Sequence, residues 1–340
     1  MQKLMKLMAF FCGVFITVSM CVIIYMGHNR VVVIAQSGPD KNQNYAPKEV
    51  TGKLITMKEA YAGGAAFKVP LPAGTTAEKI TIENIYNDQK LVITLQGVTG
   101  SNYESEYIEG YISAIESAMF WEETEKITIH IQLTEIYEYE SFLENDYLKV
   151  NLYKPSDKYD RIVVLDEVGR EGLPPSVQTL LHDITEMVQV KLEENGVRVY
   201  HLEDQGEILG DAKKLELIEQ LEANMYLGMG LYMSVDNPGD FGTVTMCDTS
   251  YFRPYISNVT LADILQKEIV TAVQGKAGGV IESEENPVLE KLKIPAAIVY
   301  PGHASNKQEY SYMEQPSYQE KIATAVWTGV SKAYEMIEAQ

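Results

Sequence analysis

The sequence contains little cysteine. There are three cysteines in 340 residues, and two of them, Cys12 and Cys21, lie inside one apolar run near the N-terminus. Cys247 is therefore alone in the remainder of the chain. A single thiol there excludes an intrachain disulfide framework, and it also excludes a zinc knuckle built from several cysteines.

Positive charge is also scarce. Lys and Arg total 28 against 48 Asp and Glu, which gives a formal net charge of −20. Nucleic-acid binding and peripheral adhesion to anionic lipid both need clustered basic residues, so this balance argues against both. The sequence also has no Gly-x-Ser-x-Gly elbow, no phosphate-binding loop and no Cys/His nucleophile pair, so it lacks the usual motifs of several enzyme classes.

One long hydrophobic run is present, over residues 7–26, and its 20 residues carry no charge. At about 1.5 Å per residue, a helix of this length spans the hydrocarbon core of a bilayer. Lys3 and Lys6 precede the run and Arg30 follows it, so the positive-inside rule places residues 1–6 in the cytoplasm. We therefore expect a single-pass membrane anchor, with the rest of the chain outside the cytoplasm.

A cleaved signal peptide is the alternative to this anchor. Residues 33–35 offer a small-residue cleavage site, although it lies well beyond the apolar run. Cleavage would give a secreted form and would change the attachment of the protein but not its compartment. An exported chain without disulfides suits a bacterial surface better than a eukaryotic secretory pathway.

Two further regions follow a polar linker at residues 27–49. Residues 50–155 contain segments that alternate apolar with polar side chains, and residues 79–86 and 90–97 flank a short turn typical of a β-hairpin. Within this region, residues 104–121 space their isoleucines at helical intervals and predict one inserted helix. We therefore expect a small β-rich domain, loosely similar to the modules that target cell-wall enzymes to the wall.

Residues 160–340 alternate apolar strand-like runs with amphipathic helices. Predicted strands lie at 161–166, 197–200, 230–235 and 296–300. One predicted helix ends at Asn195-Gly196, a second contains Leu215 and Leu221, a third covers 258–273, and a fourth closes the chain. This order predicts an α/β fold, with a parallel or mixed sheet covered by helices on both faces.

The same region resembles the zinc-dependent N-acetylmuramoyl-L-alanine amidases of bacterial cell walls. The family has a strand, a Gly-Phe-Leu-Ser-Asn-like turn and a Tyr-Gln-x-Lys-Ile-Ala helix. In this chain the residues that fall in register are Pro295, Gly302, Ser305, Asn306, Tyr318, Gln319, Lys321, Ile322 and Ala323. Residues 257–270 resemble the family's Ser-x-x-Leu-Ala helix, and residues 161–166 resemble its first strand.

The resemblance implies a zinc hydrolase. In the family, two His and one Glu hold one zinc, whose bound water is activated, and a further Glu moves the proton. Carried onto this sequence, those four positions hold Gly169, Val177, Asp236 and Tyr300. Neither Gly nor Val offers a zinc ligand, and a tyrosine with an ordinary pKa near 10 cannot replace a carboxylate base. We therefore predict no catalytic residues, no resident metal and no cofactor.

A rebuilt metal site is the alternative, and it would make the protein an active amidase with zinc. His182, Glu167 and Glu171 approach the old site in sequence, and Asp236 with His303 forms the weaker ligand pair. Glu167, Asp236, Tyr300 and His303 are also the residues expected to line any groove that remains.

The sequence therefore favours a membrane-anchored, catalytically inactive amidase-like protein that binds peptidoglycan or a cell-wall protein partner. An active peptidoglycan hydrolase is the second hypothesis, and a surface protein that never touches the wall is the third.

Overall fold

A computed structural model describes residues 53–54, 56–59, 65–72, 74–98, 107–110, 112–144, 146–202, 208–234, 236–250, 256–283 and 286–339. The expected cytoplasmic tip (1–6), anchor (7–26) and linker (27–49) lie outside these residues. In the part that is described, no helix is both long and apolar enough to cross a bilayer.

The chain divides into two units. The N-terminal unit comprises the described residues up to 85 together with 90–133 and 141–150, and the C-terminal unit comprises 86–89, 134–140 and the described residues from 151 onward. The short segments 86–89 and 134–140 thus belong with the C-terminal unit although they precede it in sequence.

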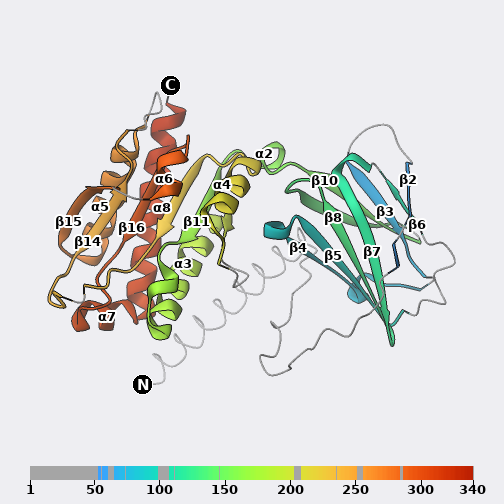
Figure 1. Ribbon diagram of the computed structural model, residues 1–340, viewed down its shortest axis with the longest axis horizontal. Coiled ribbons are helices and arrows are strands. Elements are labelled where there is room, and N and C mark those ends of the chain that lie inside the picture. Colours follow the sequence, from blue (N-terminus) through green and yellow to red (C-terminus); the bar gives the residue numbers. More distant parts are fainter. Residues whose placement is uncertain are drawn as a thin grey trace, which may run out of the picture. The chain divides into compact units, whose positions relative to one another are not determined.

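The N-terminal unit is built from two five-stranded sheets, visible as two layers in Figure 1. One sheet has the order β1 (Lys53–Leu54), β7 (Ile115–Glu123), β8 (Lys126–Leu133), β5 (Lys90–Gln96) and β4 (Ile80–Ile85). The other has the order β2 (Thr56–Glu59), β6 (Tyr107–Gly110), β3 (Ala66–Pro70), β10 (Tyr147–Tyr153) and β9 (Glu138–Glu144).

The predicted hairpin is confirmed. β4 and β5 pair antiparallel from Ile80 opposite Leu95 to Ile85 opposite Lys90, and residues 86–88 form a 3₁₀ turn between them. Gln89 completes the connection with a φ of 53°. Apolar side chains on β5 and β8 alternate strictly between buried and partly exposed positions, as expected for strands with one face in a core.

The predicted helix at residues 104–121 is wrong. Its described part contains β6, a short 3₁₀ turn at Ile112–Ala114 and β7. The ladder between β7 and β8 shifts register between Ile115 and Ser117, which marks an extra residue on β7. Because of this bulge, Ile115 and Ala118 are both buried although they are three residues apart. The isoleucines whose spacing predicted a helix, Ile108, Ile112 and Ile115, lie in β6, in the 3₁₀ turn and at the start of β7, so their helical spacing spans three separate elements.

The C-terminal unit contains a six-stranded mixed sheet in the order β12 (Arg198–His201), β11 (Ile162–Glu167), β13 (Met225–Met229), β16 (Ala296–Tyr300), β14 (Thr243–Cys247) and β15 (Ala277–Glu282). The first four strands are mutually parallel, β14 runs antiparallel to β16, and β15 is parallel to β14. The expected mixed α/β architecture is therefore confirmed.

Two strands differ from the expectation. The predicted strand at 230–235 is wrong in position: β13 covers Met225–Met229 and ends before that range, in which Tyr232 makes only an isolated bridge with His303. β14 and β15 were not predicted, because β15 is mostly exposed and contains two glycines that interrupt any apolar alternation. They extend the sheet on the side of β16.

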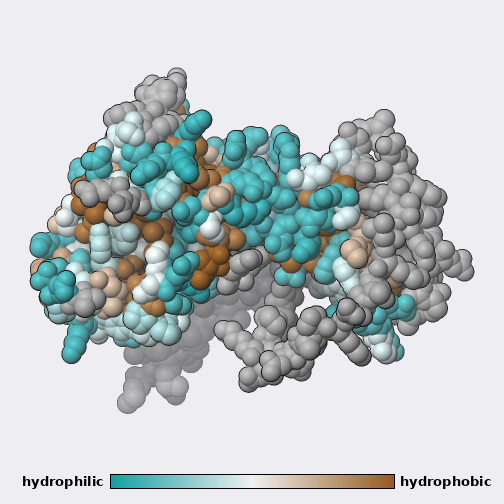
Figure 2. All heavy atoms as spheres, viewed as in Figure 1, coloured by the Kyte–Doolittle hydropathy of each residue, from teal (hydrophilic) through white to brown (hydrophobic). Residues whose placement is uncertain are grey.

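Helices cover both faces of this sheet (Figure 1). α3 (Pro175–Glu194), α5 (Asn258–Val273) and α8 (Pro316–Glu338) pack with Val163, Leu165 and Val299 in one hydrophobic cluster, which defines the first face. α4 (Asp211–Gln220) and α6 (Pro287–Lys291) pack with Ile162, Val164 and Ile298 in a second cluster, on the opposite face. Figure 2 shows that the outer surface of the unit is largely hydrophilic on the side drawn, with smaller hydrophobic areas between.

Candidate functional site

The parallel strands β11, β13 and β16 end at one edge of the sheet. Glu167 pairs with Met229, and Met229 pairs with Val299, one residue before the end of β16, so the ends of the three strands lie in one row. Of the four positions matched to the family's zinc and catalytic residues, Gly169 and Asp236 lie in the loops after β11 and β13, Tyr300 ends β16 and Val177 lies in α3. Functional groups of α/β folds commonly gather at the carboxyl ends of parallel strands.

Tyr300 ends β16 and lies in an aromatic stack. Its ring centroid is 4.2 Å from that of Tyr232, and the ring of Tyr232 lies 5.0 Å from that of His303 at an interplanar angle of 20°. Burial, together with the nearby Tyr232, raises the pKa of Tyr300 to about 12. The side chain at this position is therefore a neutral phenol at physiological pH, and it is part of a packed aromatic cluster.

Val177 and Tyr300 lie on opposite faces of the sheet. Val177 is 4% exposed and packs in the cluster of α3, α5 and α8, whereas Tyr300 packs against the cluster of α4 and α6. The two side chains therefore do not approach a common point.

The other two positions are exposed. Gly169 follows β11 with a φ of 74°, in the left-handed region that favours glycine, and Asp236 is exposed on the loop after β13. A family-type zinc requires three converging nitrogen and oxygen ligands with an open fourth position. Gly169, Val177, Asp236 and Tyr300 do not supply that set. Their equivalence to the family's residues remains a prediction from the sequence.

A different cluster forms beside this edge, on the face covered by α3. Glu167 of β11, His201 of β12 and His182 of α3 each present one ligand atom, and these three atoms lie within 4.8 Å of one another. Glu167 Oε1 is 2.7 Å from His182 Nδ1 and 3.0 Å from His201 Nε2. The side chains of Glu167 and His201 are fully buried, while that of His182 is 27% exposed.

The charges around Glu167 keep it ionised. Burial alone would raise the pKa of its carboxyl group, but the adjacent imidazoles of His201 and His182 and the charge of Arg170 hold that pKa below the ordinary value. Arg170 Nη1 lies 3.1 Å from Oε2, so the two oxygens of the carboxylate face different partners.

His201 was not predicted as a site residue, although His182 and Glu167 were. It ends a strand whose place in the sheet the sequence does not reveal, and it reaches the site because β12 is the parallel neighbour of β11, with Leu165 paired to His201. Asp236 and His303 do not join this cluster. Glu171 is exposed in the 3₁₀ turn Arg170–Gly172.

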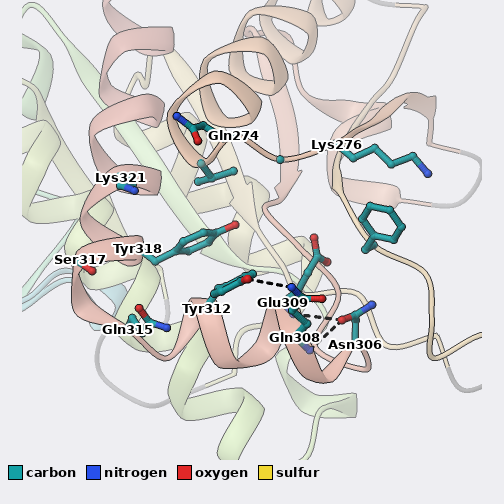
Figure 3. Close-up of a pocket in the computed structure, with 13 residues that line it drawn as sticks. Gln274, Lys276, Asn306, Gln308, Glu309, Tyr312, Gln315, Ser317, Tyr318 and Lys321 are labelled. Atoms are coloured by element: carbon teal, nitrogen blue, oxygen red, sulfur yellow. Dashed lines mark hydrogen bonds between the residues drawn. The ribbon is translucent and has the colours of Figure 1, made fainter.

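A pocket of about 740 Å³ lies where β16 ends and where β14 and β15 begin. It is lined by the C-terminal end of α5, by α7 (Lys307–Met313) and by the first turns of α8 (Figure 3). Tyr312 and Tyr318 stack with ring centroids 5.9 Å apart, and Lys276 lies 4.7 Å from the ring centroid of Phe241. Asn306, Gln308, Gln315 and Lys321 add amide and ammonium groups to the lining.

Glu309 holds the loops of this pocket together. Its carboxylate accepts backbone hydrogen bonds from Gly242 at 2.9 Å and from His303 at 2.8 Å. Asn306 caps α7 by accepting from the backbone N–H groups of Gln308 and Glu309. The pocket is thus formed by anchored loops, and Asn306, Tyr318 and Lys321 are among the residues through which the sequence resembles the amidase family.

The comparisons with known proteins concern this unit. A family model described as N-acetylmuramoyl-L-alanine amidase matches residues 176–332. No curated protein sequence matches the chain.

Several solved structures are similar to the chain. The amidase AmiC2 of Nostoc punctiforme has a TM-score of 0.45 and 20% identity over 52% of this chain and 98% of its own. The catalytic domain of the amidase CwlV from Bacillus (Paenibacillus) polymyxa var. colistinus has a TM-score of 0.45 and 18% identity over 52% and 99%. An amidase from Clostridium difficile 630 has a TM-score of 0.44 and 18% identity over 52% and 97%.

Proposed function

Residues 176–332 belong to the N-acetylmuramoyl-L-alanine amidase family, and from this premise we propose that the chain is an extracytoplasmic, membrane-anchored protein that binds peptidoglycan without cleaving it. One observation carries the proposal. Val177 and Tyr300, which the sequence resemblance matches to two of the family's four zinc and catalytic positions, pack in hydrophobic clusters on opposite faces of the sheet.

The pocket beside α7 supports binding. Peptidoglycan joins sugars to short peptides with free carboxylates, and sugars pack on aromatic rings while their hydroxyls pair with amides. Tyr312, Tyr318 and Phe241 supply the rings, and Gln308 and Gln315 supply amides. Lys276 and Lys321 supply positive charge for carboxylates in a chain that is otherwise acidic.

The activity test uses the full-length chain, purified in detergent without a polyhistidine tag. It is incubated with insoluble peptidoglycan, with and without added Zn²⁺, and released stem peptides are measured by mass spectrometry. We expect no release above a buffer control. Release of peptides with a free L-alanine N-terminus would overturn the absence of hydrolysis.

The binding test is co-sedimentation with the same peptidoglycan. We expect the chain to sediment and Tyr318→Ala/Lys321→Ala to lower the bound fraction at least about tenfold, since stacking and ion pairing each contribute about 1 kcal/mol. Lys267→Ala is the matched control, because Lys267 is an exposed lysine paired with Asp263 on α5, away from the pocket lining. No sedimentation, or equal loss in the control, would contradict the proposed pocket.

The attachment to the membrane rests on residues 7–26. Alkaline carbonate extraction of cell membranes should leave the protein in the pellet, and intact mass should include the N-terminal residues. A chain that begins after residue 35 would show instead that the segment is a cleaved signal peptide.

Hydrolysis remains the second candidate function, and the cluster of Glu167, His182 and His201 is the observation that favours it. Under that function, peptide release would require added metal and would be lost in His182→Asn.

A further inference from the structure

Glu167, His182 and His201 come from three different elements and converge on one buried point. None of these residues occupies a position matched to the family's zinc ligands, which fall at Gly169, Val177 and Asp236. The strand alternation explains the convergence. Glu167 and His201 project from the same face of the adjacent strands β11 and β12, and α3 packs over that face.

The polar atoms of this cluster are incompletely satisfied. Both ring nitrogens of His201 are buried and make no hydrogen bond among the described residues, although Nε2 lies 3.0 Å from Glu167 Oε1. A buried polar atom without a partner costs about 1–3 kcal/mol, so such atoms call for a ligand. His201 is therefore a fully buried imidazole aimed at a carboxylate without the hydrogen bond that would account for its position.

We infer that Glu167, His182 and His201 bind a divalent transition-metal ion, with zinc the best match. Two imidazole nitrogens and one carboxylate oxygen are a ligand set that suits zinc. Ligand atoms of a tetrahedral zinc site lie about 3.4 Å apart when each metal–ligand bond is about 2.1 Å. The separations of 2.7 and 3.0 Å from Glu167 Oε1 therefore need only a small outward movement of the side chains.

The surroundings fit ligation. His182 presents Nδ1 to the cluster, and its other nitrogen lies 3.6 Å from Glu186 Oε1, an arrangement that orients a metal-bound imidazole. Glu167 has Oε1 toward the histidines, while Oε2 faces Arg170 at 3.1 Å, so one oxygen can bind the ion while the arginine holds the other. The partial exposure of His182 leaves a route for the ion and for a water in the fourth position.

The metal would tie β11, β12 and α3 together at the end of the sheet. This inference does not depend on whether the chain cleaves or binds peptidoglycan, because it concerns metal content alone.

The test measures zinc in the full-length chain, purified in detergent without a metal-binding tag, stripped with chelator and titrated with Zn²⁺ by calorimetry. We expect one equivalent with a micromolar or tighter Kd, and a rise in Tm on zinc addition. His182→Asn and Glu167→Gln should each weaken binding at least tenfold and remove the Tm shift, since each loses one ligand. Glu167→Gln keeps the shape of the side chain, and circular dichroism confirms that each variant is folded.

Asp236→Asn is the matched control, because Asp236 is an exposed residue of the weaker ligand pair with His303, and it should bind zinc as the parent chain does. Loading the chain with Co²⁺ in place of zinc allows the site to be detected by visible absorption. We expect d–d bands typical of nitrogen and oxygen ligands in the parent chain, and their absence in His182→Asn. A parent chain that takes up no zinc would overturn the inference. So would zinc that persists unchanged in both ligand variants, or that is lost only in Asp236→Asn.

Discussion

Lys214 Nζ on α4 lies 2.6 Å from Asp166 Oδ1 at the end of β11, and both residues are less than a tenth exposed. Asp166 also accepts a hydrogen bond from the hydroxyl of Tyr226 at 2.5 Å. The resemblance places this aspartate where the family's first strand opens its zinc loop, and here it is held by a buried ion pair between strand and helix.

Removal of one partner from this pair should destabilise the C-terminal unit strongly. Lys214→Met leaves the Asp166 carboxylate buried without its counter-charge, and we expect a loss of about 3–5 kcal/mol in the free energy of unfolding. Trp327 fluorescence during urea unfolding measures this, in a Trp121→Phe background that silences the other tryptophan. Asp166→Asn/Lys214→Met should recover part of the loss, because no buried charge remains. A cost below about 1 kcal/mol for Lys214→Met would contradict the buried pair.

Val177 lies at the position that the sequence resemblance matches to the family's ligand Glu, and a substitution there tests whether a carboxylate can be accommodated. Val177→Glu places a charged group in the core of α3, α5 and α8, and we expect it to cost at least about 3 kcal/mol without adding zinc. The control is Val190→Glu on the same helix, where the side chain is 54% exposed and the expected change is within about 0.5 kcal/mol. A stable Val177→Glu protein that gains a second zinc would show that the helix end can move to form the family's site.

The raised pKa of Tyr300 predicts that the protein loses stability at alkaline pH. Its pKa is raised to about 12 in the folded chain, against about 10 when unfolded, so above pH 10 the unfolded state releases a proton that the folded state retains. The contribution of the neutral Tyr300 phenol to the free energy of unfolding is fully present below pH 10. It declines by at most about 1.4 kcal/mol per pH unit as the pH rises toward 12. Tyr300→Phe should make the fall of Tm between pH 10 and 11 shallower than in the parent chain. Each Tm is expressed relative to the value of the same protein at pH 8. If Tm then falls equally steeply with pH in Tyr300→Phe and in the parent chain, the result would argue against a buried phenol with a raised pKa.

Glycine is required at position 230 because a side chain there would collide with the ring of Tyr300. A Cβ added at Gly230 would lie 2.5 Å from Tyr300 Cε1, so the ring would have to move. We expect Gly230→Ala to cost about 1–3 kcal/mol, and Tyr300→Leu to relieve part of that cost in the double variant. Gly172→Ala is the matched control, because nothing lies within 4 Å of its Cβ position. Additive effects of the two substitutions would contradict this contact.

Apolar periodicity predicted most of the fold. The alternation in residues 90–97 and the continuous run at 161–166 correspond to β5 and β11, because burial of one or both faces of a strand determines which side chains are apolar. That pattern failed at residues 104–121, where the helically spaced isoleucines belong to β6, a 3₁₀ turn and β7, and at β15, where exposure removed the alternation.

The candidate metal cluster was only partly predictable, for a different reason. His182 and Glu167 lie near the expected site in sequence, but the role of His201 depends on the order of strands in the sheet. The placement of β12 beside β11 results from tertiary packing, and no local sequence pattern encodes it.

The stack of Tyr300, Tyr232 and His303 also constrains how this chain can evolve. A single substitution that introduced a carboxylate at position 300 would place a charge in the space filled by a ring, against Gly230 and Tyr232. A carboxylate at this position is therefore disfavoured as a single change, because it costs packing free energy unless neighbouring residues change with it. An acidic residue at this end of β16 would require coordinated substitutions at Gly230, Tyr232 and position 300, so the three residues are expected to vary together.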